Sequence, residues 1–140
     1  MPLLVVRHAS AGKRREWQGD DRLRPLDEKG RRQAAGLPSL LAQFEIARIA
    51  SSPYLRCTQT VEPLSEQQGL SIEERHELEE GASLEATLVL LRELGDDAVL
   101  CTHGDVLVNL FGETGRKGST RVAELREAGP AVLEYLPPPG

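Results

Sequence analysis

The stretch Leu3-Leu4-Val5-Val6-Arg7-His8 decides the fold class. Four apolar residues in a row, followed directly by charged and polar residues, are typical of a strand that is buried on both faces of a parallel sheet. Ala98-Val99-Leu100-Cys101 shows the same pattern and leads into Thr102-His103-Gly104. We therefore expect two buried parallel strands, each of which is followed by a histidine.

Segments with helical and strand patterns alternate along the rest of the chain. Asp27 and Ser52 are suited to cap the first two helices, and the second helix is expected to begin with Pro53 and to end at Gly69. This alternation predicts a single α/β domain over residues 1–136, with three layers (α/β/α) around a mainly parallel sheet. The predicted helices cover residues 28–41, 53–68, 84–94 and 105–112, and the further strands cover 46–50, 70–72 and 131–136.

Three details complete this picture. Leu88, Leu91 and Leu94 are expected to face the core from the third helix. Residues 113–129 carry no pattern that assigns them to an element. The proline-rich residues 137–140 are expected to form a frayed tail that pairs with no strand.

Length and composition are those of one globular domain. The 140 residues are 39% hydrophobic and 28% charged, which argues against disorder. The apolar run Met1–Val6 is far shorter than the 18 or more residues of a membrane-spanning helix, and no signal-peptide pattern precedes it. Cys57 and Cys101 lack metal-ligand spacing and are expected to be small buried side chains. These features predict a cytoplasmic protein without membrane association.

The net charge of −5 is distributed unevenly. Residues 7–32 carry nine Arg or Lys against five acidic residues, whereas residues 62–97 carry eleven acidic residues against two Arg. The basic segment predicts a site for an anionic partner, although a solvated helix face balanced by an acidic neighbour would give the same composition. Aromatic residues make up 4% of the chain, too few to stack on bases, so nucleic acid is not expected as a partner.

Two histidines and two arginines are expected to meet in one crevice. Ligands bind at the carboxyl ends of the strands in an open parallel sheet, and His8 and His103 follow two such strands. Arg7 precedes His8, and Arg56 lies in the first turn of the second predicted helix. Two guanidinium groups beside two imidazoles favour a phosphate ligand, because the planar arginine fork matches a pair of phosphoryl oxygens. His76 lies in a charged run and is expected on the surface.

This group of side chains predicts phosphoryl chemistry through a histidine. A phosphate held by two arginines and one protonated histidine is open to in-line attack by the other imidazole, and water then hydrolyses the resulting phosphohistidine. Alternatively, Arg7 pairs with a carboxylate and both histidines are satisfied by hydrogen bonds in the core. A metal site built from His8, His103 and Asp105 is a third interpretation, which the neighbouring arginines disfavour.

Three motifs resemble those of the histidine phosphatase superfamily. Val6-Arg7-His8-Ala9 is similar to its Arg-His-Gly signature, residues 51–60 (SSPYLRCTQT) to its second arginine motif, and Thr102-His103-Gly104-Asp105 to its second histidine motif. The motifs occur in the family's order along nearly the whole chain. The resemblance implies a phosphoglycerate mutase-like α/β fold and a mechanism without metal or cofactor. It also implies that His8 is the phosphoryl acceptor and that Arg7, Arg56 and His103 form the phosphate pocket.

The short chain and its segment 24–34 look most like the SixA-type phosphohistidine phosphatases. They also resemble the phosphatase-like domains that follow Nudix domains in some nucleotide-sanitising hydrolases, although this sequence has no Nudix box. Ala9 replaces the family's usual glycine, as it does in the SixA-type branch. Glu80 matches the family's proton donor, a carboxylate that close SixA-type relatives lack. Glu77, Glu79 or no carboxylate at all are the alternatives, and Asp105 could instead orient a group of the pocket.

We therefore expect a phosphatase that acts on a phosphomonoester or a phosphoramidate. Protein phosphohistidine, a nucleotide and a small phosphorylated metabolite all present the same terminal phosphoryl group. A phosphoglycerate mutase-like phosphotransferase is an alternative, for which this short chain leaves little room to enclose a migrating phosphate. A non-catalytic module that binds phosphoryl groups is the other alternative.

Overall fold

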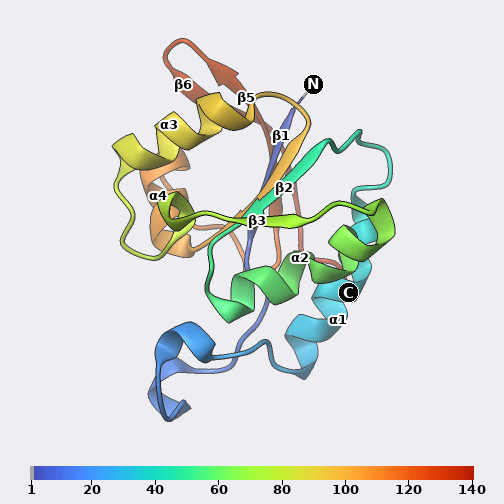
Figure 1. Ribbon diagram of the computed structural model, residues 1–140, viewed down its shortest axis with the longest axis vertical. Helices are drawn as coiled ribbons and strands as arrows, with labels where there is room; N and C mark the ends of the chain where they lie inside the picture. Colours follow the sequence, from blue (N-terminus) through green and yellow to red (C-terminus); the bar gives the residue numbers. More distant parts are fainter. Residues whose placement is uncertain (1) are drawn as a thin grey trace.

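The computed structural model describes residues 2–140, so Met1, the first residue of the predicted domain and of its apolar N-terminal run, lies outside them. The described residues form a six-stranded sheet and four α-helices (Figure 1). The strands are β1 (Leu3–Arg7), β2 (Arg48–Ser51), β3 (Ile72–Glu74), β4 (Ala98–Thr102), β5 (Thr120–Arg126) and β6 (Gly129–Leu136). The helices are α1 (Glu28–Leu40), α2 (Leu55–Gln68), α3 (Leu84–Leu94) and α4 (Gly104–Phe111).

The sheet is mainly parallel, as predicted. Its strand order is β3-β2-β4-β1-β5-β6. β1 pairs in parallel with β4, with Val5 opposite Leu100, and β2 and β3 run in the same direction. β5 is antiparallel to β1, and the edge strand β6 is antiparallel to β5. The carboxyl ends of β1 and β4 therefore lie side by side at the same end of the sheet.

Helices cover both faces of the sheet, which confirms the three layers. α1 and α2 lie against one face, and α3 and α4 lie against the other (Figure 1). Because successive side chains of a strand point to opposite faces, Leu4 and Val6 pack with α1 and α2, whereas Leu3 and Val5 pack with α3 and α4. This explains the continuous apolar run of β1. None of the helices within residues 2–140 has the length and apolar content that a membrane crossing requires.

Two of the three predicted helix-end signals are confirmed. Asp27 caps α1 by accepting a hydrogen bond from its first turn, and Gly69 ends α2 in the left-handed conformation, with a φ of 69°. Ser52 does not cap α2, which begins at Leu55, two residues later than predicted. Its hydroxyl instead lies 2.9 Å from Nε2 of His103. The cap prediction was wrong because His103, which is distant in sequence but follows the neighbouring strand β4, engages the hydroxyl.

The core face of α3 differs slightly from the prediction. Leu91 and Leu94 are buried as expected, whereas Leu88 is only partly buried. The buried stripe consists of Thr87, Leu90, Leu91 and Leu94, a spacing that places all four on one helix face. The face is therefore rotated by about one residue from the predicted one.

β3 begins at Ile72, two residues later than the predicted strand. Leu70 lies just beyond α2 and is bonded back to it: its N–H donates to the carbonyl of Ser65, and its own carbonyl accepts from the Ser65 hydroxyl. The strand starts where Ile72 pairs with Ile49 of β2.

The unassigned segment 113–129 contains β5 and the loop before it. Arg121 of β5 is buried and donates to the carbonyls of Glu113 and Thr114, which holds this loop against the sheet. The loop also reaches β1, because the carbonyl of Gly115 accepts from the Arg7 guanidinium at 2.6 Å. These contacts join residues far apart in the chain, so no local pattern reveals them.

Residues 137–140 lie in no strand of the described chain, as expected, but they are not frayed. Pro138 and Pro139 are half-buried and lie against Gly118 and against Gly36 of α1. A Cβ added at Gly36 would come 2.6 Å from Cβ of Pro139, so only glycine allows this close approach. The C-terminus accordingly lies beside α1 (Figure 1).

Candidate active site

The two histidines that were predicted to share a crevice lie together at the carboxyl ends of β1 and β4. The ring centroids of His8 and His103 are 5.4 Å apart, and the rings meet edge to face. Both residues line a cavity of about 590 Å³. Among the described residues around it, the cationic ones are Arg7, Lys13, Arg14, Arg24, Arg56 and Lys117, and the acidic ones are Glu80 and Asp105. No group of three or more His, Cys, Asp or Glu within residues 2–140 is placed to hold a metal ion.

His8 is held so that one ring nitrogen is free to react. Its Nδ1 lies 2.8 Å from the carbonyl oxygen of Ala9. A carbonyl can only accept, so Nδ1 carries the proton and Nε2 carries the lone pair. Burial, together with the nearby Arg56 and Arg7, lowers the pKa of His8 to about 3, so the imidazole is neutral. This is the protonation state of a nucleophile.

Asp27 holds the backbone that follows His8. One of its carboxylate oxygens accepts from the Ser10 hydroxyl at 2.7 Å and from the Gly12 N–H at 3.0 Å, while the other accepts from the Gly30 N–H. A Cβ at Gly30 would collide with the Ser10 carbonyl oxygen, so glycine is required there. Burial alone would raise the pKa of the Asp27 carboxyl, but these hydrogen bonds hold it below its usual value. One side chain thus ties the start of α1 to the loop beside the nucleophile.

His103 presents its other ring nitrogen to the cavity. Its Nε2 lies 2.9 Å from Ser52 Oγ and 3.5 Å from Cys57 Sγ. Its Nδ1 is buried without a hydrogen-bond partner among residues 2–140, and Oε2 of Glu80 lies 4.0 Å away. Burial, and then the neighbouring His8, lower the pKa of His103 to about 2. Burial among cations therefore disfavours a positive charge on His103 in the ligand-free site, whereas the protonated histidine was predicted for a site that holds a phosphate.

Arg7 and Arg56 are both engaged by the protein and both keep a donor free. Arg56 is fully buried and donates to the carbonyl of Asp21 at 2.8 Å, to its carboxylate at 3.1 Å and to the Glu80 carboxylate at 3.2 Å. Arg7 donates to the Gly115 carbonyl and pairs with no carboxylate in the described part of the chain. This contradicts the alternative in which a carboxylate neutralises Arg7. Nε of each arginine is buried without a partner within residues 2–140. Unpartnered buried donors favour an anionic ligand.

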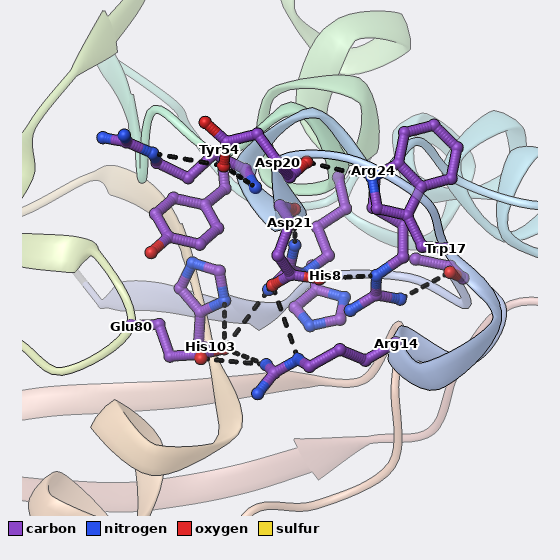
Figure 2. A network of polar contacts seen from close by, with 12 residues as sticks. His8, Arg14, Trp17, Asp20, Asp21, Arg24, Tyr54, Glu80 and His103 are labelled. Atoms are coloured by element: carbon purple, nitrogen blue, oxygen red, sulfur yellow. Dashed lines mark hydrogen bonds and ion pairs between the residues drawn. The ribbon is translucent and has the colours of Figure 1, made fainter.

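Glu80 lies at the cavity and is bound as a carboxylate. Its two oxygens accept from Nη2 of Arg14 at 2.8 and 2.6 Å, and Oε2 also accepts from Arg56. Figure 2 shows the paired Glu80 and Arg14 beside both imidazole rings. Asp105 accepts from the Gly81 N–H at 2.7 Å, so it holds the loop that carries Glu80.

The other carboxylates of this acidic loop do not line the cavity in the described structure. Glu77 pairs with Arg75 at 2.9 Å. Burial would raise the pKa of Glu77, but the Arg75 guanidinium holds it below its usual range. Of the three acidic candidates Glu77, Glu79 and Glu80, only Glu80 lines the cavity that holds His8 and His103. His76 is exposed, as predicted.

Residues 13–24 contribute side chains to the site that the motifs did not predict. Two short 3₁₀ turns shape this segment, η1 (Arg14–Glu16) and η2 (Asp21–Leu23). The first places Arg14 against Glu80 (Figure 2), and the second places Asp21 against Arg56. Arg24 is buried and donates to the Asp21 carboxylate and the Ala11 carbonyl. The excess of basic residues in 7–32 was the sequence feature that could have indicated this contribution, since the segment supplies four of the cationic residues that line the cavity.

The lowered pKa values of His8 and His103 predict that kcat/KM shows no loss near pH 6.5, where an ordinary histidine becomes protonated. An exposed histidine nucleophile would lose activity tenfold for each pH unit below about 6.5. Because both imidazoles stay neutral until the pH falls to about 3 and about 2, kcat/KM should not fall as the pH is lowered from about 8 to about 5. The measurement is kcat/KM corrected for ionisation of the substrate. A tenfold loss per unit that starts near pH 6.5 would contradict the assignment.

A mainly parallel sheet thus brings two histidines and two arginines to one cavity. The chain belongs to the histidine phosphatase superfamily (branch 1), whose family model matches residues 3–87. The fold is phosphoglycerate mutase-like, as expected.

Known proteins resemble this chain in sequence or in fold. An 8-oxo-(d)GTP phosphatase from Mycolicibacterium smegmatis is 35% identical to this chain over 156 aligned positions. The alignment covers 98% of this chain and 48% of the relative. The chain thus spans about half the length of that curated relative. The protein histidine phosphatase SixA, solved with tungstate, has a TM-score of 0.77 at 24% identity and covers 99% of this chain and 97% of its own. A mycobacterial glucosyl-3-phosphoglycerate phosphatase, solved with VO3, has a TM-score of 0.81 at 16% identity, covering 97% and 99%.

Proposed function

We propose that this domain hydrolyses phosphate groups through a covalent phosphohistidine at His8. The observation that carries the proposal is the state of the His8 ring. Its Nδ1 is bonded to the Ala9 carbonyl, and the ring with the unprotonated Nε2 lines a cationic cavity. Arg7 and Arg56 contribute a buried donor each to the same site.

In this reaction Nε2 of His8 attacks phosphorus while the bond from phosphorus to the leaving group breaks. Arg7, Arg56 and His103 stabilise the charge that shifts among the phosphoryl oxygens. The leaving group takes up a proton, for which Glu80 is the candidate carrier: its carboxylate first accepts a proton from solvent or from the phosphoryl group and then gives it to the leaving group. Water then attacks the phosphohistidine, the P–N bond breaks, inorganic phosphate leaves and His8 is regenerated.

Trapping of the covalent intermediate tests the proposal. The protein is mixed with a ³²P-labelled phosphodonor and quenched in alkali, since phosphohistidine is labile to acid. We expect label on the wild-type chain and release of inorganic phosphate. A non-catalytic binding module would leave no label, and a mutase-like phosphotransferase would return the label to a second position of the substrate.

The substrate class is part of the proposal. Lys13 and Lys117 line the cavity in addition to the two arginines, and burial together with Arg7 lowers the pKa of Lys117. These cations favour a substrate with a second anionic group beside the transferred phosphate, such as a nucleoside di- or triphosphate. The relative of which this chain spans about half is named for a nucleoside triphosphate substrate, 8-oxo-(d)GTP, which also favours a nucleotide. Comparison of kcat/KM for nucleotides, phosphohistidine and sugar phosphates tests this choice.

Glu80→Gln should separate substrates by their leaving groups. An alkoxide needs a proton in the transition state, a contribution worth roughly 10²–10⁴-fold, whereas a good aryl leaving group or the imidazole of phosphohistidine needs less help. The variant should therefore lose most activity on alkyl phosphates, little on aryl phosphates and little on phosphohistidine. Glu77→Gln is the matched control, because Glu77 pairs with Arg75 away from the cavity. Equal losses across the series, or none, would remove Glu80 as the donor.

A cytoplasmic location is the last part of the proposal. It rests on Cys57 and Cys101, which are free and buried, a state that a reducing compartment maintains. Nucleic acid and membranes are not proposed as partners. Immunoblotting of fractions from cells that produce the protein tests the location, and recovery in an exported fraction would contradict it.

A further inference from the structure

Ser52 was predicted to cap α2, but its side chain instead contacts His103 of the site. It is completely buried and does not itself line the cavity described above. Its Oγ lies 2.9 Å from Nε2 of His103, and it accepts from the backbone N–H of Tyr54 at 3.3 Å. These are the two hydrogen-bond partners of the hydroxyl within residues 2–140.

This small set of partners determines where the protons lie. The Tyr54 N–H can only donate, so it occupies a lone pair of the Ser52 oxygen. The hydroxyl proton then has one acceptor in the described structure, Nε2 of His103. A ring nitrogen that accepts carries no proton, so a neutral His103 carries its proton on Nδ1. The thiol of Cys57, 3.5 Å from the same nitrogen, is a weak donor and a weak acceptor and does not override the hydroxyl.

Nδ1 of His103 is the nitrogen that faces no protein partner. It is buried and unbonded among the described residues, with the Glu80 carboxylate 4.0 Å away. With a proton, Nδ1 can donate to a phosphoryl oxygen or to a carboxylate. Without a proton, Nδ1 would place its lone pair next to the lone pairs of those oxygens, and the two would repel each other. The position of one proton therefore decides whether His103 attracts or repels a phosphoryl group.

We propose that Ser52 is a positioning residue that fixes His103 as the Nδ1–H tautomer, so that His103 stabilises the phosphoryl group as a neutral hydrogen-bond donor. The catalytic consequence rests on the proposed function, whereas the tautomer does not. The two histidines then have complementary roles. His8 donates from Nδ1 to a carbonyl and reacts through Nε2, while His103 accepts at Nε2 and donates from Nδ1. The lowered pKa values of both rings agree with two neutral imidazoles.

Nuclear magnetic resonance of the wild-type chain tests the tautomer directly. Two-bond ¹H–¹⁵N correlation spectra of protein labelled with ¹⁵N-histidine distinguish protonated from unprotonated ring nitrogens. The variants His8→Ala and His76→Ala assign the three histidines. We expect a protonated Nδ1 and an unprotonated Nε2 for His103 at neutral pH. A protonated Nε2 in the wild-type protein would overturn the proposal, whatever the activity.

Variants at Ser52 then test the cause of the tautomer. Ser52→Ala should populate the Nε2–H form and lower kcat by roughly 10- to 100-fold, because the hydrogen bond that orients the ring is lost. Ser52→Thr keeps the hydroxyl and should restore the Nδ1–H signal and most of the rate. Ser51→Ala is the matched control, since Ser51 is also buried at the end of β2 but donates to the Ser52 carbonyl rather than to His103.

Two outcomes of this series are decisive. An unchanged tautomer and kcat in Ser52→Ala would overturn the role of Ser52, as would an equal effect of Ser51→Ala. Failure of the proposed function would appear differently. No phosphohistidine would form in any variant, while the tautomer assigned from the wild-type spectrum would stand.

Discussion

His8→Ala is expected to abolish turnover, with kcat reduced by about 10⁴-fold or more, as for loss of a covalent nucleophile in other enzymes. The ring removed is the one whose Nδ1 is bonded to Ala9 and whose Nε2 is unprotonated. His8 is buried, but it lines the cavity and its side-chain hydrogen bond is to the adjacent Ala9, so the fold should persist. Steady-state kinetics and the ³²P label measure the chemical loss, and circular dichroism checks the fold.

His76→Ala is the matched control for this prediction. His76 is exposed and lies in the charged segment before α3, so its removal should leave kcat and the label unchanged. The nucleophile assignment would be wrong if the His8 variant kept a tenth of the wild-type kcat. It would also be wrong if an alkali-stable label still formed on that variant.

Arg56→Lys is expected to lower kcat/KM by about 10²- to 10³-fold, the usual cost of one donor to a developing anion. A point ammonium cannot span two phosphoryl oxygens as the planar guanidinium does. The same guanidinium also bridges Asp21 and Glu80, at 3.1 and 3.2 Å, and a single ammonium cannot keep both contacts together with the Asp21 carbonyl. The variant should therefore also unfold at a lower temperature.

Arg32→Lys is the control for the charge-preserving exchange. Arg32 lies on the exposed face of α1 and pairs with Glu28 at 3.2 Å, so its replacement should change neither kinetics nor stability measurably. Comparison of kcat/KM and of thermal unfolding for the two variants separates a site effect from a general one. Near-normal kcat/KM for Arg56→Lys would place Arg56 outside the phosphate pocket.

The central sheet and the positions of four site residues followed from local patterns. A strand buried on both faces needs an apolar run, and such runs precede both His8 and His103. Parallel strands share an end of the sheet, so residues that follow them meet. Arg56 was found because it lies in the first turn of the helix after β2. These inferences needed only the order of elements and the direction of the strands.

The remaining parts of the site depend on contacts that cross the chain. The Arg14–Glu80 pair joins residues 66 positions apart, and the bond from Arg7 to Gly115 joins residues 108 positions apart. Arg14 and Glu80 each sit in a segment whose charge alone is typical of solvated surface. Only the folded chain brings these opposite charges to the same cavity.

Apolar runs and chain order are local properties, and they were enough to predict the parallel α/β fold and the meeting of His8, His103, Arg7 and Arg56. The protonation of these side chains depends instead on the folded chain. Burial among cations makes both imidazoles neutral, and Ser52 bonds to a histidine 51 positions away instead of capping α2. The physical reason is that a pKa and a hydrogen bond depend on what surrounds an atom in space, which neighbours along the chain do not specify.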